Sequence, residues 1–330
     1  MATKAIMRKI RPTLTDILSA REFLARYFAP TRLVEAASVS RVAGRRVFLK
    51  LEMELPTGSF KVRGALWALS EKLRTQAIRE VTASSTGNHG AAVAYAAQKL
   101  GLKATIFLPE KNNPVKRARI AALGAAIVEK GSEDLAAAWK AAEEYSQTTG
   151  AYFLNDATDL ALPAGPATIG CEILEQVPDV QAVYVPMGDT ALIRGLAAAI
   201  KQQKPGVKVI GVQAATAPSY FLSWRSGAAT ETESCDTIAD GLATRTPDAK
   251  NVRAIRELVD DVVLVSDDEM LRAIAFLSQE QLIAEPAGAG AAATAALLQR
   301  KSGSGETAVA LITGANIQKD ILERAMHLAP

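Results

Sequence analysis

Short apolar runs alternate with alanine-rich stretches along nearly the whole chain, and this alternation constrains the fold more than any other feature. Runs that are apolar throughout are typical of strands in parallel sheets that helices cover on both faces. The expected strands span residues 47–51, 81–84, 104–108, 126–129, 182–185, 208–212, 262–265 and 308–312. The expected helices span residues 13–28, 59–73, 88–100, 114–123, 132–145 and 191–201. The sequence therefore predicts an α/β fold with mainly parallel sheets.

The expected strands are too many for one small sheet, and those of residues 80–157 form a self-contained group of about three β/α units. We therefore expect a small domain of residues 80–157 inserted into a large domain made of residues 1–79 and 158–330. Residues 244–251, which include Pro247 and several polar side chains, are expected to form a loop of the large domain.

Composition and charge exclude several classes of protein. The chain has 330 residues, of which 49% are hydrophobic, so it can bury a large core and is long enough for two lobes. The formal net charge is +3 and the sequence has no basic run, which argues against a nucleic acid partner.

Cys171 and Cys235 lack the spacing of a metal site or a disulfide framework, and such low cysteine usage is typical of a reducing compartment. The sequence also has no signal-peptide core and no run of roughly 18 apolar residues, so we expect a cytoplasmic protein without membrane contact.

Lys61 stands between a glycine turn and an expected helix, in the segment Pro-Thr-Gly-Ser-Phe-Lys-Val-Arg-Gly of residues 56–64. A primary amine at such a turn suits Schiff-base chemistry, although a lysine there can also be a solvated surface charge. The neighbouring turns help to choose between these two interpretations.

Two further turns lead from an expected strand into a helix, at residues 84–90 and 188–190. Backbone N–H groups and hydroxyls at a helix N-terminus can bind a carboxylate at the first turn and a phosphate at the second. The alternative is ordinary capping of the helix by these polar side chains, and His89 by itself is more often structural than catalytic. Residues 285–290 open another helix, and residues 313–316 follow another expected strand. Because ligands of open parallel sheets bind beyond the carboxyl ends of the strands, the four turns can face one crevice.

Taken together, four segments resemble in order and spacing the motifs of fold-type II pyridoxal phosphate enzymes, the threonine/serine dehydratase family. These segments are residues 56–61, 85–90, 285–288 and 313–316. The resemblance covers residues 13–325 and implies a fold like that of the tryptophan synthase β subunit. That fold has two lobes, each with a mainly parallel sheet flanked by helices, and an active site in the cleft between them.

The resemblance also implies roles for individual residues. Lys61 would form the Schiff base with pyridoxal 5'-phosphate and later remove the α-proton of the substrate, while Phe60 would pack beside the ring. Asn88 would hydrogen-bond the phenolic oxygen of the cofactor, and Thr313 would face its pyridine nitrogen. The phosphate would be held by Gly188, Asp189, Thr190, Ala191 and Leu192. The substrate carboxylate would be held by Ser85, Thr86, Asn88 and His89.

A neutral hydroxyl at Thr313 leaves the pyridine nitrogen largely unprotonated, which favours prompt loss of a β-leaving group over a long-lived carbanion. The resemblance therefore implies an ammonia-lyase that converts a β-hydroxy-α-amino acid into a 2-oxo acid and ammonia, as a homodimer or homotetramer. The Gly-Asp-Thr loop and residues 219–224 and 239–245 look like the branch of phenylserine and hydroxyectoine-utilisation dehydratases. The candidate substrates are 3-phenylserine, threonine and serine, although residues 219–224 can also be a helix packed into the large lobe.

Several positions depart from the family pattern. Asp189 replaces a glycine of the phosphate loop, and its charge beside a phosphate costs a few kcal/mol at an effective dielectric of about 20. This cost is avoided if the carboxylate is turned away, protonated or neutralised, and Arg194 is the candidate cation. Gln213 and Ser219 replace the acidic residues of the family's optional cation site, so no metal is expected. Thr86 stands where racemases of this fold present a serine, which disfavours racemisation.

Other activities are weighed against the lyase. β-Replacement and racemisation use the same fold and cofactor, and product analysis separates them from elimination. Retention of Lys61 argues against a nonenzymatic binding module. A nicotinamide-dependent dehydrogenase is disfavoured because no G-x-G-x-x-G follows the first expected strand.

Overall fold

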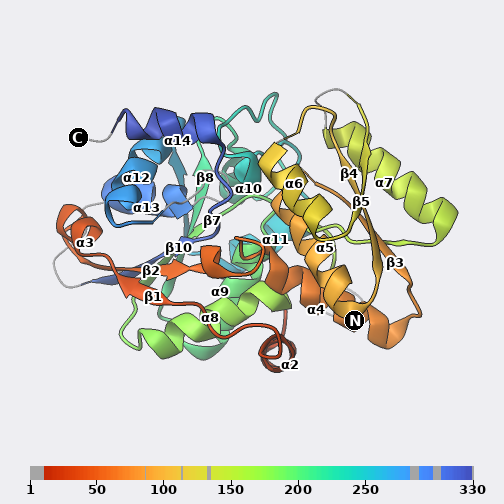
Figure 1. Ribbon diagram of the computed structural model, residues 1–330. Coiled ribbons are helices and arrows are strands. Elements are labelled where there is room, and N and C mark those ends of the chain that lie inside the picture. The colour runs from red at the N-terminus through yellow and green to blue at the C-terminus, as the bar shows by residue number, and fades with distance from the viewer. Residues whose placement is uncertain are drawn as a thin grey trace.

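The chain folds around two mainly parallel sheets, as the computed structural model in Figure 1 shows. The structure describes residues 11–85, 87–112, 114–131, 135–282, 290–299 and 306–328. The larger sheet has the strand order β1 (Leu33–Glu35), β2 (Arg46–Leu51), β10 (Thr307–Ile312), β7 (Ala182–Pro186), β8 (Lys208–Ala214) and β9 (Asp261–Val265). Only the edge strand β1 pairs antiparallel with its neighbour within this sheet. The smaller sheet is parallel throughout, in the order β5 (Ala126–Glu129), β4 (Lys103–Leu108), β3 (Glu80–Ser84) and β6 (Tyr152–Phe153).

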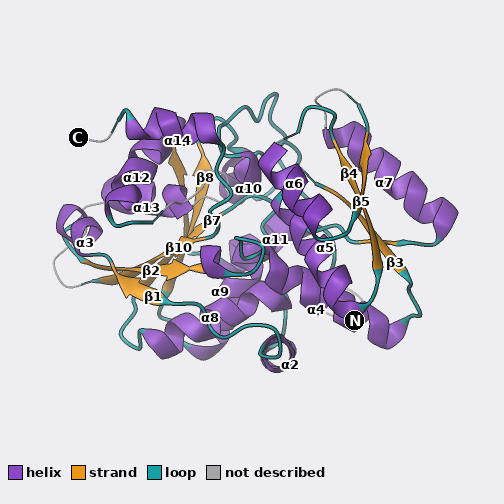
Figure 2. Cartoon of the chain, in the orientation of Figure 1, coloured by secondary structure: helices purple, strands orange, loops and turns teal. Residues whose placement is uncertain are grey.

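Helices cover both faces of the larger sheet, as Figure 2 shows. One face packs against α3 (Ala37–Ala43), α12 (Asp267–Gln279), α13 (Gly290–Gln299) and α14 (Lys319–Met326). The other face packs against α8 (Ala164–Gln176), α9 (Ala191–Gln203), α10 (Ser219–Ser226) and α11 (Ala249–Leu258). Strand β10 shows why a strand in this position is apolar throughout, because Ala310 faces the first helix layer and Leu311 the second.

The smaller sheet is enclosed in the same way. Helices α4 (Lys61–Thr75), α5 (Asn88–Leu100) and α6 (Pro114–Ala122) share one core with Val81 and Ile106, whereas α7 (Leu135–Thr149) packs against Phe107 on the opposite face. Helix α4 also packs against α8 of the larger sheet and so lies between the two sheets. The described part of the chain contains no helix that is long and apolar enough to cross a lipid bilayer.

The expected strands and most expected helices are confirmed, with two corrections. The helix expected over residues 13–28 is α2 (Leu14–Leu24), which Thr13 and Asp16 cap reciprocally. It ends early because the chain turns after Leu24, whose carbonyl accepts from the Tyr27 N–H at 2.9 Å. The loop expected over residues 244–251 ends sooner, because the Asp248 side chain accepts two backbone N–H groups and starts α11 at Ala249.

Two 3-10 helices lie in the connections between the regular elements. The 3-10 helix η1 (Glu52–Glu54) follows β2, and η2 (Asp240–Leu242) lies in the long connection between α10 and α11. Residues 219–224 lie in α10, where Tyr220 is buried against α11. The interpretation of this segment as a packed helix is therefore confirmed.

Candidate active site

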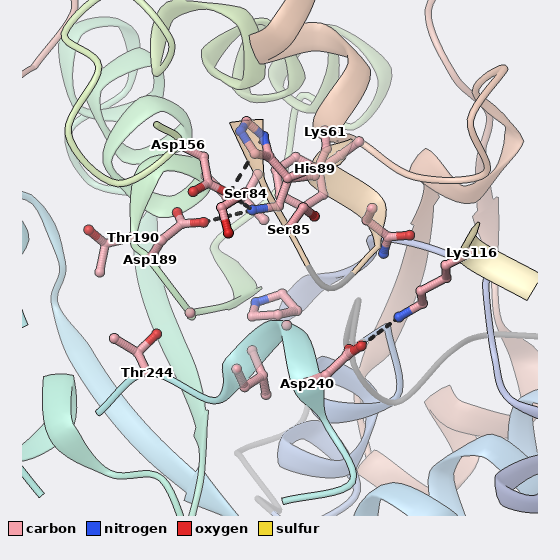
Figure 3. Close-up of a pocket in the computed structure, with 17 residues that line it drawn as sticks. Lys61, Ser84, Ser85, His89, Lys116, Asp156, Asp189, Thr190, Asp240 and Thr244 are labelled. Atoms are coloured by element: carbon pink, nitrogen blue, oxygen red, sulfur yellow. Dashed lines mark hydrogen bonds and ion pairs between the residues drawn. The ribbon is translucent and has the colours of Figure 1, made fainter. Parts of the chain in front are cut away.

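A pocket lies at the carboxyl ends of β3 and β7, which belong to different sheets, and Lys61 stands in it (Figure 3). Its wall consists of Phe60, Lys61, Ser84, Ser85, Asn88, His89, Lys116, Asp156, Pro186, Gly188, Asp189, Thr190, Leu192, Asp240, Gly241, Leu242 and Thr244. Most of the residues that the sequence analysis singled out are therefore brought together. Ala191 and Thr313 lie outside this wall, and Thr86 and residues 285–289 lie outside the described residues.

Lys61 begins α4, and the loop before it is attached to the end of β10. Ser59 forms an isolated antiparallel bridge with Gly314, and the Phe60 N–H donates to the Thr313 carbonyl at 3.0 Å. The last strand of the chain thus fixes the backbone from which the lysine projects. This contact explains why two motifs more than half a chain apart belong to one site.

Gly58 gives the same loop its close packing. Its φ is 68°, and an added Cβ would overlap the side chains of Arg119 and Asn316. Asn316 in turn donates from Nδ2 to the Thr57 carbonyl at 3.0 Å and to Asn88 Oδ1 at 2.7 Å. The lysine loop, the end of β10 and the start of α5 are therefore linked through one amide side chain.

A buried ionic cluster holds the first turn of α4. Arg63 donates from Nε to Glu52 at 2.7 Å and from Nη1 to Glu172 at 2.6 Å, and Lys50 Nζ reaches Glu172 at 2.6 Å. The four side chains are at most 5% exposed, and their two positive and two negative charges balance. Because removing one member leaves an unpaired buried charge, the cluster ties α4 firmly to η1, β2 and α8.

The Lys61 ammonium lies between two carboxylates. Its Nζ is 2.6 Å from Asp156 Oδ2 and 2.7 Å from Asp189 Oδ2 (Figure 3). Burial by itself would lower the pKa of Lys61, but the charges of Asp156 and Asp189 outweigh it and raise that pKa above its ordinary value. Burial likewise opposes ionisation of Asp156, yet the charges of His89 and Lys61 hold its pKa below the ordinary range. Lys61 is therefore a charged ammonium in this arrangement.

The cation that contacts Asp189 differs from the expected one. Arg194 is the cation expected from the sequence, but Lys61 forms the ion pair with Asp189. Arg194 donates from Nε to Thr190 Oγ1 and from Nη2 to the Ala157 carbonyl, both at 3.1 Å. Its charge interacts electrostatically with Asp189, although burial is the main effect and lowers the pKa of Arg194. Arg194 thus supports the loop around Asp189, while Lys61 supplies the direct counter-charge.

The N-terminus of α5 presents polar groups to the pocket. Ser85 Oγ accepts from the Gly87 N–H at 2.9 Å, which shapes the turn into the helix. His89 Nε2 lies 2.9 Å from the Leu154 carbonyl, and because a carbonyl only accepts, this nitrogen carries a proton. The other ring nitrogen, Nδ1, lies 3.7 Å from Asp156 Oδ2.

The N-terminus of α9 forms the opposite wall. Thr190 caps the helix with a left-handed backbone, φ 74°, and Asp189 Oδ1 accepts from the Ala191 N–H at 2.8 Å. Gly188 packs so closely on the next loop that an added Cβ would overlap the Gly241 carbonyl oxygen. This compact turn places backbone N–H groups and the positive end of a helix dipole at the pocket.

Thr313 is fully buried behind Phe60, and its Oγ1 has no hydrogen-bond partner within the described ranges of the chain. A buried hydroxyl without a partner costs roughly 1–3 kcal/mol, so such an atom indicates a missing ligand group. Ser84 Oγ is also without a partner there, and Ser84 lines the pocket.

Three charged residues of the pocket escaped the sequence analysis as site residues: Asp156, Lys116 and Asp240. Asp156 follows β6, a strand of only two residues inside the short apolar run of residues 151–154, to which the sequence reasoning assigned no strand. Lys116 Nζ pairs with Asp240 Oδ2 at 2.7 Å, joining α6 to η2. Asp240 lies in the segment of residues 239–245 noted above for its resemblance, whereas Asp156 and Lys116 lie in no motif, because the tertiary fold alone brings them to the pocket.

The chain is similar to known proteins over most of its length. A family model described as "Pyridoxal-phosphate dependent enzyme" matches residues 24–314. The L-threonine ammonia-lyase of Thermotoga maritima is 38% identical over 96% of this chain and 78% of the relative. The L-threonine dehydratase catabolic TdcB of Escherichia coli K12 is 35% identical over 92% of this chain and 93% of the relative.

Solved structures agree with this relationship. The processed form of threonine deaminase isoform 2 from Solanum lycopersicum superposes with a TM-score of 0.89 at 32% identity, covering 96% of this chain and 87% of that one. Maize serine racemase gives a TM-score of 0.89 at 27% identity, covering 96% of this chain and 98% of that one. The fold, the pocket around Lys61 and these matches lead to one conclusion: the chain belongs to the family of pyridoxal-phosphate dependent enzymes.

Proposed function

We propose that this enzyme is an ammonia-lyase that converts a β-hydroxy-α-amino acid, threonine or serine first, into a 2-oxo acid and ammonia. The observation that carries the proposal is the placement of the Lys61 amine in a pocket that the N-termini of α5 and α9 both line. The similarity to threonine ammonia-lyases and dehydratases over most of the chain supports the choice of elimination.

The pocket residues fit pyridoxal 5'-phosphate. The buried hydroxyl of Thr313, which has no hydrogen-bond partner among the described residues, suits a hydrogen bond to a pyridine nitrogen. The turn from Gly188 to Thr190, with Ala191 and Leu192 after it, would hold the phosphate at the N-terminus of α9. Phe60 would pack beside the ring, and Asn88, held by Asn316, would bond the phenolic oxygen. We assign these roles to the residues as part of the proposal.

Different side chains of the site would carry out different parts of the reaction. When bound, the cofactor supplies an aldehyde for the amine and a conjugated ring that accepts electrons from the bond broken at Cα. Lys61 would hold the cofactor and, once released, take the proton from Cα. The turn of Ser85, Thr86, Asn88 and His89 would bind the substrate carboxylate, and the Leu154 carbonyl fixes the His89 ring within it. A neutral Thr313 beside the pyridine nitrogen favours β-elimination over transamination.

A phenyl-bearing substrate is the second candidate. Residues 239–245, part of the likeness to phenylserine dehydratases, contribute Leu242 and Thr244 to the pocket wall. Leu192 and Phe60 add apolar surface to the same wall, and burying a phenyl ring is worth about 2–3 kcal/mol. By contrast, Tyr220 packs against α11 instead of lining the pocket, so α10 adds no aromatic surface to it.

Domain limits, assembly and compartment complete the proposal. We place the small domain at residues 80–157, which contain all four strands of the smaller sheet, and the large domain at residues 1–79 and 158–330. We further propose a homodimer or homotetramer in the cytoplasm, which analytical ultracentrifugation and cell fractionation would test.

The deciding experiment measures ammonia and 2-oxo acid released from threonine, serine and 3-phenylserine by the purified holoenzyme. Faster formation of 2-oxobutyrate than of phenylpyruvate supports a threonine enzyme, and the reverse order supports the aromatic branch. Lys61→Ala should reduce turnover by at least about a thousandfold while the far-ultraviolet circular dichroism is unchanged. A product mixture of D- and L-amino acid without oxo acid would instead identify a racemase.

A further inference from the structure

We propose that the carboxylates of Asp156 and Asp189 together form the binding site for the α-ammonium group of the substrate. This ammonium site adds detail to the proposed function. It depends on that function in one respect, because the ligand is taken to be an amino acid. Asp156 becomes a substrate-binding residue that the sequence motifs did not include.

The geometry already shows how these carboxylates bind a primary ammonium. Asp156 Oδ2 and Asp189 Oδ2 converge on the single nitrogen of Lys61, at 2.6 and 2.7 Å (Figure 3). An –NH₃⁺ group has three donors, so two carboxylates satisfy two of them and leave the third free. The α-ammonium of an amino acid has the same charge and the same three donors. The site is therefore built for this kind of group.

Both carboxylates are positioned by contacts other than Lys61. Asp189 Oδ1 accepts from the Ala191 N–H at 2.8 Å, in the first turn of α9. Asp156 faces His89 Nδ1 at 3.7 Å, and the opposite nitrogen of that ring is fixed on the Leu154 carbonyl at 2.9 Å. Each carboxylate therefore retains one contact when the lysine nitrogen leaves the site.

The reaction requires the lysine nitrogen to leave. In the loaded enzyme Lys61 is joined to the cofactor, and its nitrogen is no longer a free ammonium. The side chains of Asp156 and Asp189 are only 24% and 21% exposed, so two unpaired negative charges there would be unfavourable. The other lysine of the pocket wall, Lys116, is paired with Asp240. The substrate brings an ammonium of the right chemistry to the place from which the lysine nitrogen has moved.

The test uses full-length Lys61→Ala without cofactor, so that neither turnover nor cofactor loading enters the result. Ethylammonium chloride is titrated into this variant by calorimetry in sodium buffer. We expect saturable binding to K61A, and binding at least about tenfold weaker to K61A/D156N, because a charge-assisted hydrogen bond is lost. K61A/D240N is the matched control, since it removes a carboxylate of the same pocket that pairs with Lys116; its affinity should stay within about twofold.

Each result of this titration either supports the proposed ammonium site or contradicts it. Equal binding by K61A and K61A/D156N would overturn the proposal, and so would displacement of ethylammonium by an equal concentration of potassium. K61A/D156E retains the charge and should recover part of the affinity, which distinguishes loss of the site from loss of the fold. In the holoenzyme, Asp156→Asn should raise KM for the amino acid more than it lowers kcat. Ethylammonium binding that depends on Asp156 in an enzyme without lyase activity would uphold the site and refute only the proposed function.

Discussion

At the scale of single residues, the protonation of Lys61 separates the apoprotein from the loaded enzyme. Asp156 and Asp189 hold the lysine as an ammonium, whereas only a neutral amine can attack an aldehyde. The pKa of Lys61 is raised in the folded chain above the ordinary 10.5, so the ion pairs stabilise the apoprotein below that pH and are lost as pH rises through the folded value. Cofactor uptake by the apoprotein should therefore accelerate with pH.

The substitution Asp156→Asn should lower the pKa of Lys61 and should speed cofactor uptake about tenfold for each unit by which that pKa decreases.

Stopped-flow absorbance of the Schiff base measures this uptake between about pH 7 and about pH 10. Asp240→Asn serves as the control, because Asp240 pairs with Lys116 and its loss should leave the rate nearly unchanged. Identical rates for the wild type and Asp156→Asn at every pH would show that the lysine charge does not limit uptake.

At the scale of elements, the start of α9 combines a left-handed Thr190 with a glycine in close contact. The added Cβ of Gly188→Ala would overlap the Gly241 carbonyl oxygen, which belongs to the backbone and cannot move aside as a side chain can. Overpacking of this kind costs about 1–3 kcal/mol, and the turn that would hold the phosphate must shift. We expect the dissociation constant for pyridoxal 5'-phosphate to rise about tenfold or more, measured by fluorescence titration.

Gly206→Ala is the matched control for this substitution. Gly206 lies in the turn between α9 and β8, and an added Cβ there meets nothing within 4 Å. Its cofactor affinity should equal that of the wild type. Unchanged affinity in Gly188→Ala would show that the cofactor phosphate is bound elsewhere.

At the scale of the whole molecule, Lys116 and Asp240 connect the two halves of the pocket. Lys116 lies on α6 beside the smaller sheet, and Asp240 opens η2 beside the larger one; their ion pair is 2.7 Å long. The side chains of Lys116 and Asp240 are 5% and 30% exposed, so the burial of this ion pair is intermediate between that of a surface pair and that of a buried pair. A double-mutant cycle with Lys116→Met and Asp240→Asn should give a coupling energy of about 1 kcal/mol in the free energy of unfolding.

Urea unfolding at low and high salt measures this coupling, and salt should reduce it because Asp240 is partly exposed. Arg74 and Glu71, a surface pair within α4, provide a control cycle whose coupling should stay below about 0.5 kcal/mol. Strictly additive effects of Lys116→Met and Asp240→Asn would mean that the pair does not join the two halves energetically.

Local sequence predicts elements well where a local signal exists. Strands such as β7 and β10 are apolar over their whole length and were predicted nearly to their limits. β1 and β6 are too short to form a pattern, and β6 has only two residues, so both were missed. The expected loop of residues 244–251 extends too far, because the polar Asp248 is typical of a loop but here caps α11.

The same distinction applies to the site. The α/β class, the lysine turn and the helix N-termini that could bind anions follow from the sequence, because each depends on residues adjacent in the chain. Which charges meet follows from the folded structure, since Lys61 lies in α4 and Asp156 and Asp189 lie in two separate loops. Ion pairs act through space and depend on distances of a few ångströms, which no local pattern specifies. The counter-charge of Asp189 therefore became identifiable only when the folded chain placed the Lys61 ammonium beside it.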